Sequence, residues 1–275
     1  MRILRIALYC LLGGLSLTPV ALGNGGFAWW WLAGIVLSAS FAPVALFGPR
    51  RAISQFGVVA PVLLIVTVLC LWSEALILVQ APEVQQHAVR DLVGASVIYL
   101  ILATVLAILA VLLKLPRVGG PKVEFRSASK VALLIFVCGI AYVLYYLIIG
   151  SITYQFFTKG YYPDAPKIVA RLGIWFWLIQ LGRGVLMTLA ALPLIRTLRM
   201  SRVQAAIAVG LIMWVAGGAA PLLLPNPLMV PAQRFIHTIE ILTQNVSLGI
   251  TMVLLLRAKQ RRSGVNLPVT ADAHG

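Results

Sequence analysis

The chain has 275 residues, of which 61% are hydrophobic and only 11% charged. Because an average soluble domain has about 25% charged residues, this composition excludes a water-soluble globular protein, and it also excludes intrinsic disorder and a disulfide-built miniprotein. The 22 Lys and Arg residues outnumber the 7 Asp and Glu residues and give a net charge of +15, so the positions of these charges along the chain decide what they mean.

Eight apolar runs predict eight transmembrane helices. A spanning helix needs roughly 20 residues, because about 30 Å of hydrocarbon is crossed at 1.5 Å per residue. The runs lack the alternation of barrel strands, so the predicted fold is an all-α polytopic helical membrane bundle. We expect a single transmembrane domain over 1–262 and a flexible cytoplasmic tail over 263–275, with spans near 3–23, 27–47, 56–79, 92–113, 131–153, 172–195, 203–224 and 235–256.

The first run has two interpretations. Arg2 and Arg5, an apolar stretch and small residues up to Gly23 are also typical of a signal peptide cleaved before Asn24. We expect instead an uncleaved first span that packs on the second through a short Gly-rich hairpin. Cleavage would leave seven spans and place the N-terminus outside.

The connections between spans differ in their positive charge. The N-terminus, the second, fourth and sixth connections and the C-terminus together hold 16 Lys and Arg residues, and the other connections hold 5. The positive-inside rule therefore predicts that both termini are cytoplasmic, in a bacterial-type inner membrane. We expect the basic loops to contact anionic lipid headgroups, and we exclude nucleic-acid binding because the charges are divided among short loops. The fifth connection, 150–171, is long enough to hold a short interfacial helix or a cap.

Short motifs indicate no cofactor and no known catalytic machinery. Cys10, Cys70 and Cys138 fall in three different spans without CxxC spacing, which predicts buried thiols and neither a redox pair nor a zinc knuckle. The sequence has no Walker A, GxSxG, HExxH or GxGxxG motif.

A metal site is a weaker alternative on the outer side. His87 and His237, with Asp91 and Glu240 at helical offsets, are residue types that bind zinc or iron. However, His87 falls in a polar loop, and these two histidines are the only ones expected on that side. We therefore expect no metal ion.

The informative residues are three ionisable side chains inside spans, Glu74, Arg183 and Glu240. Each costs at least about 2.5–3.5 kcal/mol to place at the centre of a spanning helix, so each should face the protein interior and have a partner. Counting residues from the span ends places all three at similar depth in the outer half of the membrane. Two ion pairs are possible, Arg183 with Glu240 or Arg183 with Glu74.

The eighth span carries a polar stripe at spacings of three and four residues, which is one face of a helix and should face the bundle or a wet cavity. Its members are Gln233, His237, Glu240, Gln244, Ser247 and Thr251. On the sixth span Gln180 and Arg183 share a face. The candidate site residues are Glu74, Gln180, Arg183, His237, Glu240 and Gln244.

Three functions fit this pattern. The first is a permease or transporter in which Arg183 attracts an anionic group and Glu74 or Glu240 handles a proton, in a site open to the extracytoplasmic side. The second is a membrane enzyme that acts on a lipid or lipid-linked substrate, with His237 and Glu240 as acid and base. The third is a non-catalytic partner of another membrane protein, in which the ion pair is purely structural.

Overall fold

The computed structural model describes residues 1–21, 26–79, 82–117, 119–121, 123–224 and 229–258, and all its elements within these residues are helical. They are α1 Arg2–Leu15, η1 Thr18–Val20, α3 Phe27–Ser40, α4 Ala42–Phe47, α5 Ala52–Val62, η2 Leu63–Cys70, α6 Leu71–Glu74, η3 Ala75–Val79, α7 Pro82–Leu112, α8 Ala128–Thr153, η4 Tyr154–Thr158, α9 Ala165–Leu172, α10 Ile174–Thr197, α11 Arg202–Trp214, η5 Val215–Ala219, α12 Ala220–Leu223 and α13 Pro231–Leu256.

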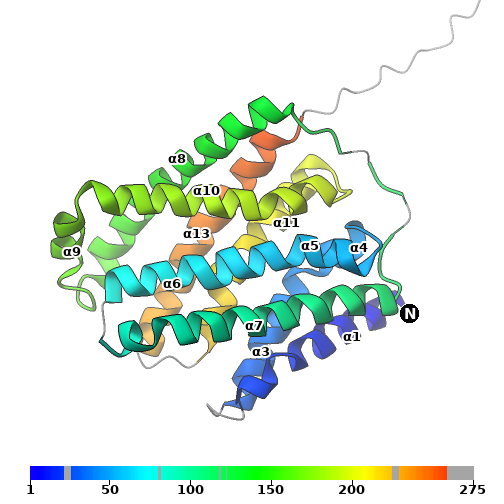
Figure 1. Ribbon diagram of the computed structural model, residues 1–275, viewed down its shortest axis with the longest axis horizontal. Coiled ribbons are helices and arrows are strands. Elements are labelled where there is room, and N and C mark those ends of the chain that lie inside the picture. The colour runs from blue at the N-terminus through cyan, green and yellow to red at the C-terminus, as the bar shows by residue number, and fades with distance from the viewer. Residues whose placement is uncertain (22–25, 80–81, 118, 122, 225–228, 259–275) are drawn as a thin grey trace, which may run out of the picture.

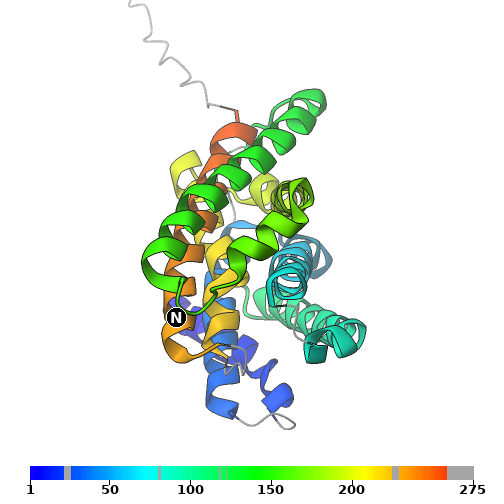
Figure 2. The same ribbon diagram turned by 90° about the vertical axis from the view of Figure 1, so that its left-hand side faces the viewer.

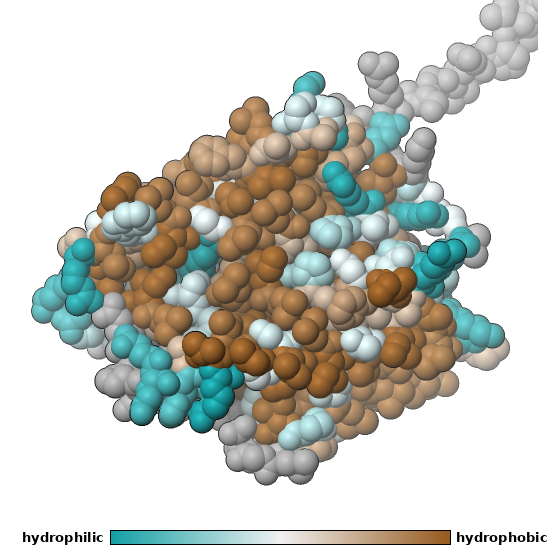
Figure 3. All heavy atoms as spheres, in the orientation of Figure 1, coloured by the Kyte–Doolittle hydropathy of each residue, from teal (hydrophilic) through white to brown (hydrophobic). Residues whose placement is uncertain are grey.

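Eight continuous helical segments are long and apolar enough to cross a membrane, which confirms the predicted fold class and makes the chain a multi-pass membrane protein. They are Arg2–Val20, Phe27–Phe47, Ala52–Ile77, Gln85–Leu112, Ala128–Thr158, Ile174–Thr197, Arg202–Leu223 and Pro231–Leu256. Apolar side chains cover the middle of the face drawn in Figure 3, and hydrophilic residues gather at its two ends. The possible cleavage site before Asn24 and the tail 263–275 lie outside the described residues.

Helices α10 and α13 each pack against several other helices. Helix α13 packs against α11 and α8, α10 packs against α8 and α5, α5 packs against α7, and α1 packs against α3. Figure 2 shows α8 lying along α13, with α7 on the opposite side of the bundle. The short helix of the fifth connection is α9, which joins α8 to α10.

Glycines allow two of these pairs to approach closely. A Cβ on Gly249 of α13 would lie 2.5 Å from the Cα of Gly210 on α11, and a Cβ on Gly184 of α10 would lie 3.0 Å from the Cα of Gly139 on α8. In lipid there is no hydrophobic driving force between spanning helices, so their association depends on the close packing that small residues allow. The first crossing brings α11 and α13 together at Gly210, and the second brings α8 over the polar residues of α10.

The basic connections form one end of the bundle. The N–H of Arg117 donates to Leu46 O at 2.8 Å, and the N–H of Arg199 donates to Phe47 O at 2.9 Å, so two loops are held on the end of α4. Arg126 donates to Leu255 O at 2.6 Å. Figure 1 places the N-terminus at this same end. An even number of candidate spans brings the start of the first, Arg2, and the end of the last, Leu256, to the same side of the bundle.

Arg257 is a buried cation in this region. It is 4% exposed and donates to Ile195 O through Nε at 2.9 Å and Nη2 at 2.6 Å, to Leu198 O at 2.7 Å and to Met200 O at 3.1 Å. These carbonyls belong to the end of α10 and the turn after it, where backbone acceptors lack helical partners. Burial lowers the pKa of Arg257 to about 10, so it remains protonated at neutral pH.

Among the described residues, four segments are π-helical: η2 and η5 lie inside spans, and η3 and η4 lie at span ends. Pro61 lies two residues before η2, and its missing N–H and bulky ring favour such a distortion. The widened turns surround Glu74, which ends the single α-helical turn between η2 and η3. Because π-helical turns occur often at functional sites, they draw attention to this part of the bundle.

Candidate functional site

The first part of the site is an ion pair between α10 and α6. Arg183 is 7% exposed, and its Nη2 lies 2.7 Å from Glu74 Oε2. Its Nη1 donates to Gln180 Oε1 at 2.8 Å, one turn earlier on α10. Within the described residues its Nε has no hydrogen-bond partner. A buried guanidinium therefore retains one free donor beside its carboxylate.

Helix α8 contributes two tyrosines to this pair. Tyr146 donates to Glu74 Oε1 at 3.3 Å, and Arg183 Cζ lies 5.7 Å from the centre of the Tyr142 ring. The glycine at position 184 makes this contact possible, because a Cβ there would lie 2.6 Å from Tyr142 Cβ. The positive charge is thus held between a carboxylate and an aromatic face, both of which stabilise it.

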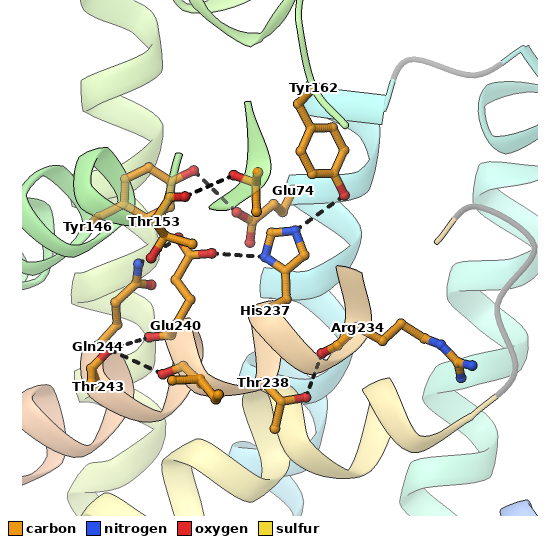
Figure 4. Close-up of polar contacts among 12 residues, drawn as sticks. Glu74, Tyr146, Thr153, Tyr162, Arg234, His237, Thr238, Glu240, Thr243 and Gln244 are labelled. Carbon is orange, nitrogen blue, oxygen red and sulfur yellow. Dashed lines mark hydrogen bonds and ion pairs between the residues drawn. The ribbon is translucent and has the colours of Figure 1, made fainter. Parts of the chain in front are cut away.

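The second part of the site is a chain of hydrogen bonds on α13. Nδ1 of His237 lies 2.9 Å from Glu240 Oε2, and its Nε2 lies 3.2 Å from the Tyr162 hydroxyl. Gln244 donates to the other Glu240 oxygen at 3.2 Å. The carboxylate orients the imidazole, and the phenol extends the chain into the connection before α9 (Figure 4).

Tyr162 connects the two parts electrostatically. It lies outside the spans, which end at Thr158 and resume at Ile174. Burial raises the pKa of its phenol, and the carboxylates of Glu240 and Glu74 raise it further. Both acids therefore act on the same hydroxyl, and Figure 4 shows them converging with His237 from α6 and α13.

The two parts differ in exposure. The Glu74 side chain is 31% exposed, whereas that of its partner Arg183 is 8% exposed. The side chains of His237 and Glu240 are 21% and 12% exposed. Glu74 is thus the more accessible of the two carboxylates of the site, and the Arg183 Nε without a hydrogen-bond partner is buried on the guanidinium that Glu74 contacts.

One of the two predicted ion pairs is present in the structure. Glu74 is the partner of Arg183, and Glu240 contacts His237 and Gln244 instead. The polar stripe of α13 faces neighbours in the bundle: Gln244 is buried, and Thr251 lies 2.8 Å from the Tyr145 hydroxyl of α8. All six predicted site residues therefore belong to one of the two hydrogen-bonded groups.

Of the residues weighed for a metal site, His237 and Glu240 belong to the hydrogen-bonded group on α13, whereas His87 and Asp91 lie on α7 and belong to neither group. Asp91 pairs with the neighbouring Arg90 at 3.1 Å. Among the described residues there is no group of three or more His, Cys, Asp or Glu side chains that could hold a metal ion.

Three site residues were not predicted, namely Tyr142, Tyr146 and Tyr162. The tyrosines of α8 lie in the predicted span 131–153, which has no Asp, Glu, Lys, Arg or His, and Tyr162 belongs to an aromatic-rich connection, a composition typical of a membrane interface. One signal was present: Tyr142, Tyr145 and Tyr146 are spaced by three and four residues and so share a face of α8.

No family model matches the chain, and no curated protein and no solved structure was found to be significantly similar to it. The functional argument therefore depends on the geometry of the site.

Proposed function

We propose that the chain is a permease-like carrier of a small anionic solute, with proton-linked uptake through a site that opens to the side opposite the termini. The observation that supports this most is the Arg183 guanidinium, which is buried inside a span, has a free Nε and is paired with the most accessible carboxylate of the site. Ionisable groups in this position mark ion and solute pathways.

Anion binding at Arg183 competes with Glu74. A carboxylate, phosphate or sulfonate on the solute offers the same pair of oxygens that Glu74 offers to the guanidinium. Once it is displaced, the Glu74 carboxylate lacks its cationic partner and lies beside the bound anion, and we propose that it accepts the proton that travels with the solute. The solute anion and one proton then enter together, and the net charge of the site does not change.

The His237–Glu240 pair makes this step sensitive to pH. With one shared proton the pair is neutral as a whole, either as imidazolium and carboxylate or as imidazole and carboxylic acid. Loss of that proton would leave a net negative charge beside the anion site, which would disfavour anion binding. Tyr162, hydrogen-bonded to His237, links the pair to the surface and supplies a route for the proton.

The test uses the full chain in proteoliposomes that contain the pH dye pyranine. An inward gradient of methanesulfonate, succinate or phosphate should acidify the lumen, and the rate should rise as the external pH falls. The double variant Glu74→Gln/Arg183→Gln, which keeps the net charge, should lose the signal, and Arg90→Gln, at an exposed surface pair, should keep it. Acidification by none of these anions, or full activity of Glu240→Gln, would contradict the proposal.

A second candidate is a membrane enzyme that acts on a lipid-linked substrate. The carboxylate–imidazole–phenol order of Glu240, His237 and Tyr162 is the arrangement that orients a general acid or base. Its test is turnover of a fluorescent phospholipid by the purified protein. His237→Asn should abolish that turnover, whereas Glu74→Gln/Arg183→Gln should not.

A further inference from the structure

A second feature with unpaired positive charge lies at the opposite end of the bundle. A pocket of about 480 Å³ opens where the end of α4, the segment after α7 and the start of α11 meet. The residues that line it include Phe47, Arg117, Gly120, Arg199, Ser201 and Gln204. This volume lies within the range of roughly 300–1,000 Å³ found for small-molecule sites.

Backbone contacts hold this pocket in shape. The N–H groups of Arg117 and Arg199 donate to Leu46 O and Phe47 O, so both arginine-bearing segments are fixed on the same helix end. Gly120, at φ 124°, lies so close that a Cβ there would be 2.9 Å from both the Cβ and the carbonyl oxygen of Arg199. The two arginines are thus placed by the backbone.

Unlike Arg126, Arg202 and Arg257, the two arginines have no anionic or carbonyl partner among the described residues. Arg126, Arg202 and Arg257 donate to carbonyl oxygens at helix ends. In the part of the chain that the structure describes, neither the Arg117 nor the Arg199 side chain makes a hydrogen bond or ion pair, and Arg117 lies over the Phe47 ring at 4.6 Å. No acidic residue lines the pocket.

Polar donors complete the pocket. Ser201 Oγ accepts from the Gln204 N–H, and Gln204 Oε1 accepts from the Ser201 N–H, both at 3.3 Å. These bonds use the acceptor oxygens and leave the Ser201 hydroxyl hydrogen and the Gln204 amide N–H groups available. Two guanidinium groups and two neutral donors form a set that suits a phosphate oxyanion.

We propose that this pocket binds the phosphate of an anionic phospholipid headgroup. The pocket lies at the ends of spanning helices, where lipid phosphates lie, and at the end that charge distribution predicts to be cytoplasmic. The aromatic ring of Phe47 forms its apolar side. The site is independent of the Arg183 site, because it is built from different residues at the other end of the spans.

Native mass spectrometry of the purified full chain tests this proposal. With added phosphatidylglycerol, the wild-type protein should retain one tight lipid adduct, and phosphatidylcholine should bind weakly. Arg117→Gln/Arg199→Gln should weaken phosphatidylglycerol binding roughly 30-fold. The matched control Arg50→Gln/Arg51→Gln removes the same charge from exposed positions at the same end, outside the pocket residues, and should change binding less than threefold.

Three results would overturn the proposal. The first is equal weakening in both double variants, which would indicate diffuse attraction to a basic surface. The second is unchanged binding in Arg117→Gln/Arg199→Gln when its thermal unfolding matches wild type. The third is tighter binding of soluble glycerol 1-phosphate than of phosphatidylglycerol, which would assign the pocket to a soluble phosphate compound.

Discussion

Replacement of Arg257 by methionine should destabilise the protein through loss of an end cap on α10. The guanidinium makes four hydrogen bonds to Ile195 O, Leu198 O and Met200 O, and methionine has a similar volume but no donor. Three carbonyls lose a partner at about 1–3 kcal/mol each, and relief from burying the charge offsets part of this cost. We expect a net loss of about 3 kcal/mol.

Thermal unfolding in detergent, followed with a thiol-reactive dye, measures this loss. Cys70 and Cys138 are 3% and 0% exposed and react only on unfolding, so a Cys10→Ala background gives a clean signal. A loss of about 3 kcal/mol corresponds to a fall in Tm of roughly 6–12 °C for a chain of this size.

Two comparisons make the result specific. Arg257→Lys keeps the charge but offers a single ammonium to three carbonyls, so it should recover about half of the loss. Lys130→Met removes an exposed charge at the same end of the bundle and should change Tm by less than about 2 °C. If Arg257→Met unfolds within 1 °C of Lys130→Met, the capping argument is wrong.

Three further predictions concern packing and the polar site. Gly249→Ala should lower stability by about 1–3 kcal/mol because its Cβ meets backbone, whereas Gly57→Ala, which meets nothing within 4 Å, should be neutral or slightly stabilising; the same thermal assay ranks them. Arg183→Gln should lower the free energy of unfolding by about 3–5 kcal/mol, because it leaves Glu74 without its cationic partner. The added change Glu74→Gln should restore part of that stability, which a double-mutant cycle measures. Tyr162→Phe removes one hydrogen bond and should slow proton-linked uptake about tenfold without a change in Tm; because the pKa of this phenol is raised, it stays protonated at pH 6–9, so the defect should be the same across that range in pyranine assays.

The architecture could be predicted from the sequence because the hydrocarbon core imposes one physical requirement on every span. Eight apolar runs predicted eight spans, and the structure has eight candidate spans within its described residues. The boundaries differ where helices continue into the polar region: the fifth segment reaches Thr158 and the eighth begins at Pro231. Hydropathy detects the apolar part of a helix and not its capped ends.

For the site, the sequence could predict the depth of each residue and the contacts within one helix, but not the contacts between helices. Residue counting gives depth, and i,i+3 spacing gives the His237–Glu240 contact, because both depend on helix geometry alone. Which carboxylate pairs with Arg183 depends on how the helices are arranged side by side, and α10 packs against α5 and η2, which lead into the helical turn that carries Glu74. For the same reason, the basic residue at 257 was counted as a loop charge, although it is buried among carbonyls.

The most direct test of an externally accessible anion site at Arg183 is the charge selectivity of chemical modification at position 74. Glu74→Cys, in the Cys10→Ala background, places a thiol beside the Arg183 guanidinium, which then lacks its carboxylate partner. The native Glu74 side chain is 31% exposed. The anionic sulfonatoethyl methanethiosulfonate, added from the side opposite the termini, should react at least tenfold faster than the cationic trimethylammonium reagent. Methanesulfonate should slow the reaction. Equal rates, a preference for the cation, or reaction only from the side of the termini would contradict the central claim.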